Sequence, residues 1–223
     1  MDGLHIERGS LSEYETLARW HYRAAPPAVP VLTLRAALDD RLAGVLVIAM
    51  PVLNGPWRET AWPGWLTDLD KRGAALELNA RLRTIARLVV APPFRARGVA
   101  SALVRTYLRS PLTHRTEALA AMGTLCPVFE RAGMRRVDRP PGRAEARVHA
   151  ALRIAGVRPW MLADARTRRQ LSRSRDIEHA VRALATDRWR QGRDAPTVEL
   201  LDRLWPYISA RPAAFVHDKS RGP

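Results

Sequence analysis

Several residue types are scarce in this chain of 223 residues. A single cysteine, Cys126, excludes an internal disulfide and indicates a reducing compartment. No apolar run approaches the roughly 18 residues that a membrane span needs, and the N-terminal MDGLHIERGS lacks the apolar core of a secretory signal. The six histidines are scattered without the spacing of a zinc site. We therefore expect a cytoplasmic protein with no membrane association and no metal.

Lysine is almost absent, although the chain is strongly basic. Lys71 and Lys219 are the only lysines among 37 basic residues, so arginine carries nearly all of a net charge of +15. Such a surface attracts polyanions, either nucleic acid or a phosphorylated cofactor. A GC-rich coding sequence also produces this enrichment in arginine and alanine without selection for function. Nucleic acid is therefore one candidate partner. The charge alone does not distinguish binding of nucleic acid from a bias in composition.

The order of apolar patterns predicts a mixed α/β sheet. The β-branched runs 29–38 and 41–50 flank Asp39-Asp40 and predict an antiparallel hairpin. Strands and helices then alternate along the chain, which favours an α/β class. The other expected elements are helices over 11–22, 73–81 and 126–133, strands over 83–90 and 116–123, a strand from Met134, and a long loop over 51–66.

The pattern changes from about Ala144. Residues 144–157 fit a strand or a helix, and arginine-rich helical patterns follow to about residue 208. We therefore expect one α/β domain over 1–156 and a basic helical extension over 157–223. The extension can close an acceptor cleft, form a dimer or lie along a polyanion, and the sequence does not fix the oligomeric state.

The stretch VVAPPFRARGVASALVRTYL, residues 89–108, is the most informative in the sequence. A strand that runs into a turn of small residues and then a helix presents unpaired backbone N–H groups, and the helix dipole adds partial positive charge. This combination suits a phosphate or pyrophosphate. Gly98 and Ala100 leave room for the ligand, while Arg95 and Arg97 supply charge. With a single glycine, the spacing is neither the dinucleotide fingerprint nor the P-loop.

Two motifs in this part of the chain resemble landmarks of the GNAT acetyltransferase superfamily. RARGVA (95–100) resembles its (Q/R)-x-x-G-x-(G/A) phosphate-binding signature, and VFERAGM (128–134) resembles its second landmark, F-Y-E-R-x-G-F. The resemblance covers roughly residues 30–140. It implies a GNAT-like fold, in which a mixed, mostly antiparallel central sheet contains splayed parallel strands and is flanked by helices.

The resemblance also implies a reaction and a co-substrate. It implies transfer of an acyl group from acetyl-CoA, or another acyl-CoA, to an amine acceptor. By matching position, the backbone at Val89 and Val90 would bind the pantetheine arm of coenzyme A. The pyrophosphate would be held by the amides of the turn and the first helical residues, namely Arg95, Ala96, Arg97, Gly98, Val99, Ala100 and Ser101.

The sequence departs from the family pattern at the position of a frequent catalytic acid. The family often has a tyrosine in the second landmark, and Phe129 stands there instead. Either the thiolate leaves without help or another residue donates the proton. The candidates are Cys126, Glu117, His114 and Tyr22. Cys126 also fits a small buried residue, and His114 and Glu117 also fit a loop and a solvent-facing position.

Aromatic residues provide candidates for acceptor binding. The Trp-His-Tyr cluster at 20–22 includes His21 and Tyr22, and the loop after the hairpin carries Trp57 and Trp62. These rings either stack on a planar acceptor or pack into the core.

Three functions stay open at this stage. The leading one is an acyl-CoA-dependent N-acyltransferase with an amine acceptor of unknown class. The second is a nucleic-acid-modifying enzyme, because WHYR (20–23) weakly resembles an element of the phage Mom-like branch, which modifies adenine in DNA; a tRNA-directed acyltransferase belongs to the same alternative. The third is a catalytically inactive binding module with the same fold, for which Phe129 is the main support.

Overall fold

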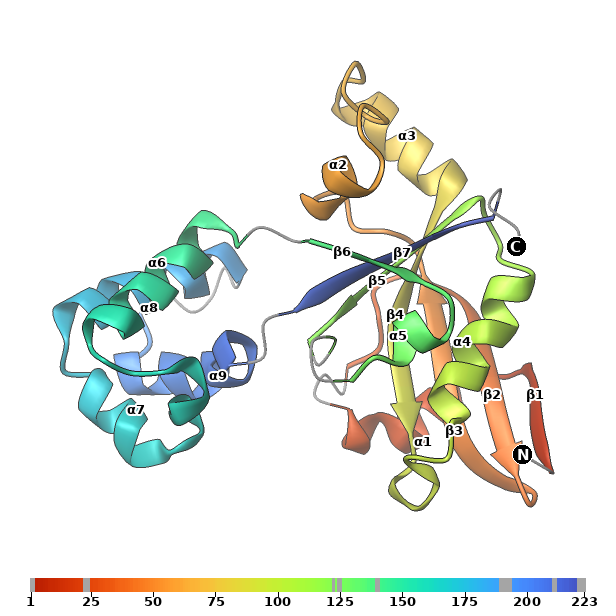
Figure 1. Ribbon diagram of the computed structural model, residues 1–223, viewed down its shortest axis with the longest axis horizontal. Coiled ribbons are helices and arrows are strands. Elements are labelled where there is room, and N and C mark those ends of the chain that lie inside the picture. Colours follow the sequence, from red (N-terminus) through yellow and green to blue (C-terminus); the bar gives the residue numbers. More distant parts are fainter. Residues whose placement is uncertain are drawn as a thin grey trace. The chain divides into compact units, whose positions relative to one another are not determined.

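The chain forms two compact units in the computed structural model (Figure 1), which describes residues 3–21, 25–121, 123, 126–138, 141–188, 194–209 and 212–219. The sheet unit comprises Met1–Arg139 with Ala213–Pro223, and the helical unit comprises Pro140–Pro212. This division differs from the expected one at residue 156. The helix after residue 142 packs within the helical unit, and residues 213–218 return to the sheet.

The sheet unit is built on a seven-stranded sheet in the described residues, and only its β4–β5 pair is parallel. The predicted class, a mixed and mostly antiparallel sheet with one parallel pair, is confirmed. The strand order is β1-β2-β3-β4-β5-β7-β6. The strands are β1 (Leu4–Arg8), β2 (Pro30–Leu38), β3 (Arg41–Ala49), β4 (Leu82–Val90), β5 (Arg115–Ala120), β6 (Arg135–Val137) and β7 (Ala213–Asp218).

The predicted hairpin is the β2–β3 pair. Asp39 and Asp40 both have positive φ, 51° and 58°, as a two-residue turn of type I′ requires. All residues of β3 from Ala43 to Ala49 are buried. Since neighbouring side chains of a strand point to opposite faces, both faces of the sheet are covered at β3.

Helices cover this sheet and fill its main core. The helix expected over 11–22 ends at Leu17 and continues as a 3₁₀ turn, and the loop expected over 51–66 contains a short helix. Tyr14 on α1 and Leu103 and Tyr107 on α4 lie in the core with β3 and β4. The elements are α1 (Leu11–Leu17), η1 (Ala18–Trp20), α2 (Trp57–Ala61), α3 (Lys71–Arg81), η2 (Pro92–Phe94), α4 (Val99–Arg109) and α5 (Val128–Arg131).

The helical unit has a hydrophobic core of its own. Residues 144–157, for which strand and helix were both open, form most of α6, and Val148, Ala151 and Leu152 are buried at helical spacing. They pack with Leu162, Leu184 and Leu201 from other parts of the unit. The elements are α6 (Arg143–Ile154), η3 (Pro159–Ala163), α7 (Ala165–Leu171), α8 (Arg175–Arg188) and α9 (Thr197–Ser209). In the described part of the chain, every helix is too short or too polar to cross a bilayer.

Candidate functional site

A β-bulge in β4 breaks the regular pairing of the sheet. Val47 of β3 pairs with Arg87, and the next residue, Ile48, pairs with Ile85. Ala86 is therefore the extra residue on β4. A bulge of this kind bends its strand and increases the local twist.

The parallel strands β4 and β5 separate at this bulge. They pair from Leu82 with Arg115 as far as Ile85 with Ala118, and the pairing stops there. β4 nevertheless continues to Val90 and β5 to Ala120. The second half of β4 thus has an edge that is not paired with β5, which we call the open edge of β4.

Leu88 and Val90 present their backbone groups at the open edge. The Ala91 N–H donates to Ala43 O at 2.9 Å, on the side of β3. Because backbone groups alternate sides along an antiparallel strand, those of Val89 also face β3, whereas those of Leu88 and Val90 face the other side. Within the described residues, no partner binds the Leu88 backbone groups or the Val90 N–H, so these can bind a ligand, whereas Val90 O accepts the Arg95 Nε–H at 3.3 Å. The backbone groups of Val89, which the sequence suggested, are instead paired with β3.

The turn after β4 presents a run of unpaired amides. Ala96 and Gly98 have positive φ, 60° and 77°, and the first backbone bond of α4 runs from the Ala102 N–H to Gly98 O at 3.0 Å. No backbone or side-chain acceptor in the described part of the chain binds the N–H groups of residues 96–101. We call residues 96–101 the amide loop. Its donors and the positive end of α4 meet the requirements of an anion site.

Two arginines add charge to the amide loop. The side chains of Arg95 and Arg97 are exposed, and the Arg95 Nε–H donates to Val90 O at 3.3 Å, which ties the loop to the open edge. Arg97 has no ion pair with any described residue. Backbone donors with adjacent guanidinium groups fit the pyrophosphate of coenzyme A.

Cys126 lies two residues before a contact with the amide loop. Its thiol is free and exposed. Two residues later, Val128 O accepts the Ser101 hydroxyl at 3.4 Å, so the start of α5 adjoins the first turn of α4. Four catalytic residues were expected. Of those that the structure describes, Cys126 is exposed and lies at this end of the sheet.

The other catalytic candidates have different surroundings. His114 is exposed and precedes β5, so it lies at the end of that strand opposite to the separation from β4, and its C=O accepts the Lys219 N–H at 2.8 Å. Tyr22 lies outside the described residues. No group of three or more His, Cys, Asp or Glu side chains within the described ranges is placed to hold a metal ion.

Glu117 belongs to a buried polar network. Its side chain is 1% exposed and forms an ion pair with Arg58 at 2.7 Å. Its second oxygen accepts Arg58 Nε–H and Trp57 Nε1–H, both at 2.9 Å, and Thr84 Oγ1 donates to the first oxygen at 2.9 Å. These contacts engage both oxygens. The structure therefore gives Glu117 a place inside the fold and not in an open acceptor pocket.

The aromatic residues expected to bind an acceptor are also used inside the fold. Trp57 is buried against Glu117, and Trp62 is buried with its indole N–H donating to Asp218 at 2.9 Å. His21 is half-buried at the end of η1. The fold brings Trp57 into contact with Glu117. Among the described residues, Trp57 has no contact with the amide loop.

Phe129, the residue in the place of the family tyrosine, points into the core. Its ring is 8% exposed and stacks on Phe215, with centroids 5.1 Å apart. Sequence reasoning missed Leu88 and the bulge residue Ala86, because no local pattern marks a bulge in an apolar strand.

Solved structures with a similar fold are GNAT acetyltransferases. Ard1 from Thermoplasma volcanium is 14% identical over 62% of this chain and 87% of its own, with a TM-score of 0.39. NAA60 from Arabidopsis thaliana, solved with acetyl-CoA, is 16% identical over 63% and 89%, with a TM-score of 0.42. An agmatine N-acetyltransferase is 14% identical over 61% and 85%, with a TM-score of 0.37. At these identities the likeness concerns the fold.

Neither a protein-family description nor a curated protein matches the sequence. The three solved structures are thus acetyltransferases of low sequence identity to this chain, the class of protein that the two sequence motifs resemble.

Proposed function

We propose that the protein is an acyl-CoA-dependent N-acyltransferase that transfers an acetyl or similar acyl group to an amine. The observation that carries this proposal is the amide loop, whose unpaired donors follow directly on the open edge of β4. The two features together match an elongated ligand with a pyrophosphate at one end and a polar, amide-containing arm.

Each part of the site has a role in binding. The N–H groups of residues 96–101 and the Arg97 side chain would hold the pyrophosphate, because donors and positive charge converge there. The backbone groups of Leu88 and the Val90 N–H would bind the amides of the pantetheine arm in the manner of an added strand. Gly98 has a φ of 77°, which favours a residue without a side chain. Because no side chain is present there, the neighbouring amides stay accessible to the ligand.

After both reactants are bound, the reaction is an acyl transfer. The bound co-substrate supplies an activated thioester. The acceptor nitrogen attacks the carbonyl carbon, the C–S bond breaks and the sulfur leaves as a thiolate. The nitrogen loses a proton to solvent water, and the thiolate takes up one proton, so that an amide and free coenzyme A result. The chain holds the two reactants in place, and an N–H at the open edge would stabilise the negative charge that develops on the carbonyl oxygen. Cys126 is our candidate donor of the proton to the thiolate.

Calorimetry with acetyl-CoA tests the binding proposal. Wild type should bind, and Gly98→Trp should not, because the indole fills the loop in front of its amides. Gly64→Trp is the matched control. Gly64 has a similar φ of 73°, and a Cβ at this position would meet no atom within 4 Å, so the variant carries the same backbone strain elsewhere in the sheet unit. No binding by folded wild type, or equal loss in both variants, contradicts the proposal.

Turnover distinguishes the enzyme from a binding module. With an amine panel that includes small amines, peptides, duplex DNA and tRNA, Cys126→Ala should lower kcat by about 10²-fold or more, as is typical for loss of a general acid, and leave acetyl-CoA affinity unchanged. An unchanged kcat removes Cys126 from the mechanism. Binding without turnover on any acceptor would favour the inactive module.

A further inference from the structure

The helical unit carries a concentration of unpaired positive charge on and after α7. Residues 165–175 contain five arginines in eleven positions and no acidic residue. Arg166, Arg169, Arg173 and Arg175 are exposed, and none of their guanidinium groups has a hydrogen bond or ion pair with a described residue. We call these four residues the arginine face.

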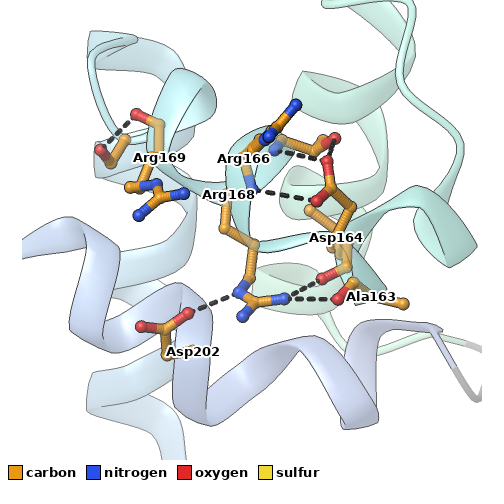
Figure 2. A network of polar contacts seen from close by, with 9 residues as sticks. Ala163, Asp164, Arg166, Arg168, Arg169 and Asp202 are labelled. Carbon is orange, nitrogen blue, oxygen red and sulfur yellow. Dashed lines mark hydrogen bonds and ion pairs between the residues drawn. The ribbon is translucent and has the colours of Figure 1, made fainter.

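The fifth arginine, Arg168, has a structural role that separates it from the arginine face. It donates to Leu162 O at 2.6 Å and to Ala163 O at 2.9 Å and forms an ion pair with Asp202 on α9. Figure 2 shows its guanidinium directed to these partners, whereas those of Arg166 and Arg169 carry no contact. Arg168 thus holds α7 on its neighbours and leaves the other arginines free.

α7 is also fixed at its beginning. The Asp164 carboxylate accepts the N–H groups of Arg166 and Thr167, both at 3.1 Å, and the Thr167 hydroxyl at 3.0 Å (Figure 2). A capped helix that is anchored by an ion pair presents Arg166 and Arg169 from a rigid support, which lowers the entropy lost when they bind a partner.

A large exposed aromatic ring lies on the element that precedes α7. Trp160 on η3 is 68% exposed, and η3 packs against α7. An indole exposed to this degree on the element that precedes and contacts α7 is suited to stacking on a nucleobase while the arginines contact phosphates.

We propose that the arginine face and Trp160 bind single-stranded nucleic acid, independently of the acyl-CoA site. A membrane surface would need an exposed apolar stripe on the helix. The apolar residue of α7, Leu171, is instead buried, and the remaining exposed residues of 165–175 are alanine and glutamine. The charge and the polar surroundings therefore favour a phosphate backbone.

The test is fluorescence anisotropy of the full chain with a labelled oligo(dT) of about 20 nucleotides, across a salt series. The test variant replaces Arg166, Arg169 and Arg173 by Gln. The control replaces Lys71, Arg72 and Arg136, exposed cations of the sheet unit, by Gln and so loses the same charge. For single strands each phosphate contact contributes about 0.7 to the slope of log K against log salt, so the test variant should flatten the slope by about 2. The control should keep it.

A second variant tests the stacking contact. Trp160→Ala should weaken oligo(dT) binding about fivefold or more, since loss of one base stack has roughly this effect, and its exposed position leaves the fold unchanged. The proposal is overturned if wild type does not bind oligo(dT) at low salt, if the two triple variants behave alike, if Trp160→Ala binds as wild type does, or if duplex DNA or acidic vesicles bind more tightly than oligo(dT).

Failure of this proposal is distinguishable from failure of the acyl-CoA proposal. The triple variant of the arginine face should bind acetyl-CoA as wild type does, and Gly98→Trp should bind oligo(dT) as wild type does. Circular dichroism of every variant checks that the fold is retained.

Discussion

Each unit contains an ion pair between an arginine and a carboxylate, and the two pairs differ in their exposure to solvent. In the sheet unit, the side chains of Arg58 and Glu117 are 4% and 1% exposed, whereas in the helical unit the Asp202 side chain is 51% exposed and that of its partner Arg168 is 12% exposed. The pair in the sheet unit is buried, so loss of one member would leave the other as an uncompensated buried charge. The pair in the helical unit, whose carboxylate is exposed, orients the surface helix α7. In the described part of the chain, Arg97 at the amide loop and the four residues of the arginine face have no ion pair.

Removal of one member of the buried pair should have the largest effect on stability. Glu117→Ala leaves Arg58 buried and uncompensated, and we expect a loss of about 3–5 kcal/mol in the free energy of unfolding by urea. If the variant does not fold, the double variant Arg58→Met/Glu117→Leu serves instead. It should recover most of the stability because apolar side chains replace both charges. A single variant as stable as wild type would contradict the buried network.

A cavity in the helical core should act on that unit alone. Leu201 is fully buried, and Leu201→Ala should cost about 2–5 kcal/mol. Amide hydrogen exchange should show lost protection in α6, α8 and α9 and unchanged protection in β2, β3 and β4, since the two cores share no residue. Equal loss of protection in both units would show that they do not have separate cores.

Removal of the exposed pair should have a smaller effect. Asp202→Ala takes one partner from Arg168, which keeps its bonds to Leu162 O and Ala163 O. We expect less than about 1 kcal/mol in urea unfolding. A loss as large as that of Glu117→Ala would remove the contrast between the two pairs.

The smallest expected effect is a pH dependence of the sheet unit. Burial lowers the pKa of His217 below its ordinary value of 6.5, and Asp218 opposes this shift in part. The folded state then binds fewer protons than the unfolded state, so stability is complete above pH 6.5 and falls as the pH decreases through the folded pKa. His217→Gln should reduce this dependence in thermal unfolding between pH 7 and 5. A steeper dependence in the variant would contradict the sign.

The sequence predicted the parts of the site that depend on local patterns. The hairpin, β4, the small-residue turn and α4 follow from apolar periodicity and from one glycine that begins a helix. Gly98 indeed has a left-handed φ, and the unpaired amides follow from helix geometry alone.

The parts that the sequence did not predict depend on contacts between distant residues. Trp57 and Trp62 occur in a stretch that reads as a loop, but their indole N–H groups meet Glu117 and Asp218, 60 and 156 positions away. β7 is a short strand that follows a whole helical unit and pairs with β5 and β6. The domain boundary was misplaced for the same reason.

The most direct measurement of the central claim is a titration of isotope-labelled protein with acetyl-CoA, followed by amide resonances. We predict that the resonances of residues 96–101 and of Leu88 and Val90 shift together and saturate, while those of α7 stay unchanged. Shifts confined to other residues, or none at saturating acetyl-CoA, would contradict the assignment of the amide loop and the open edge of β4 as the acyl-CoA site.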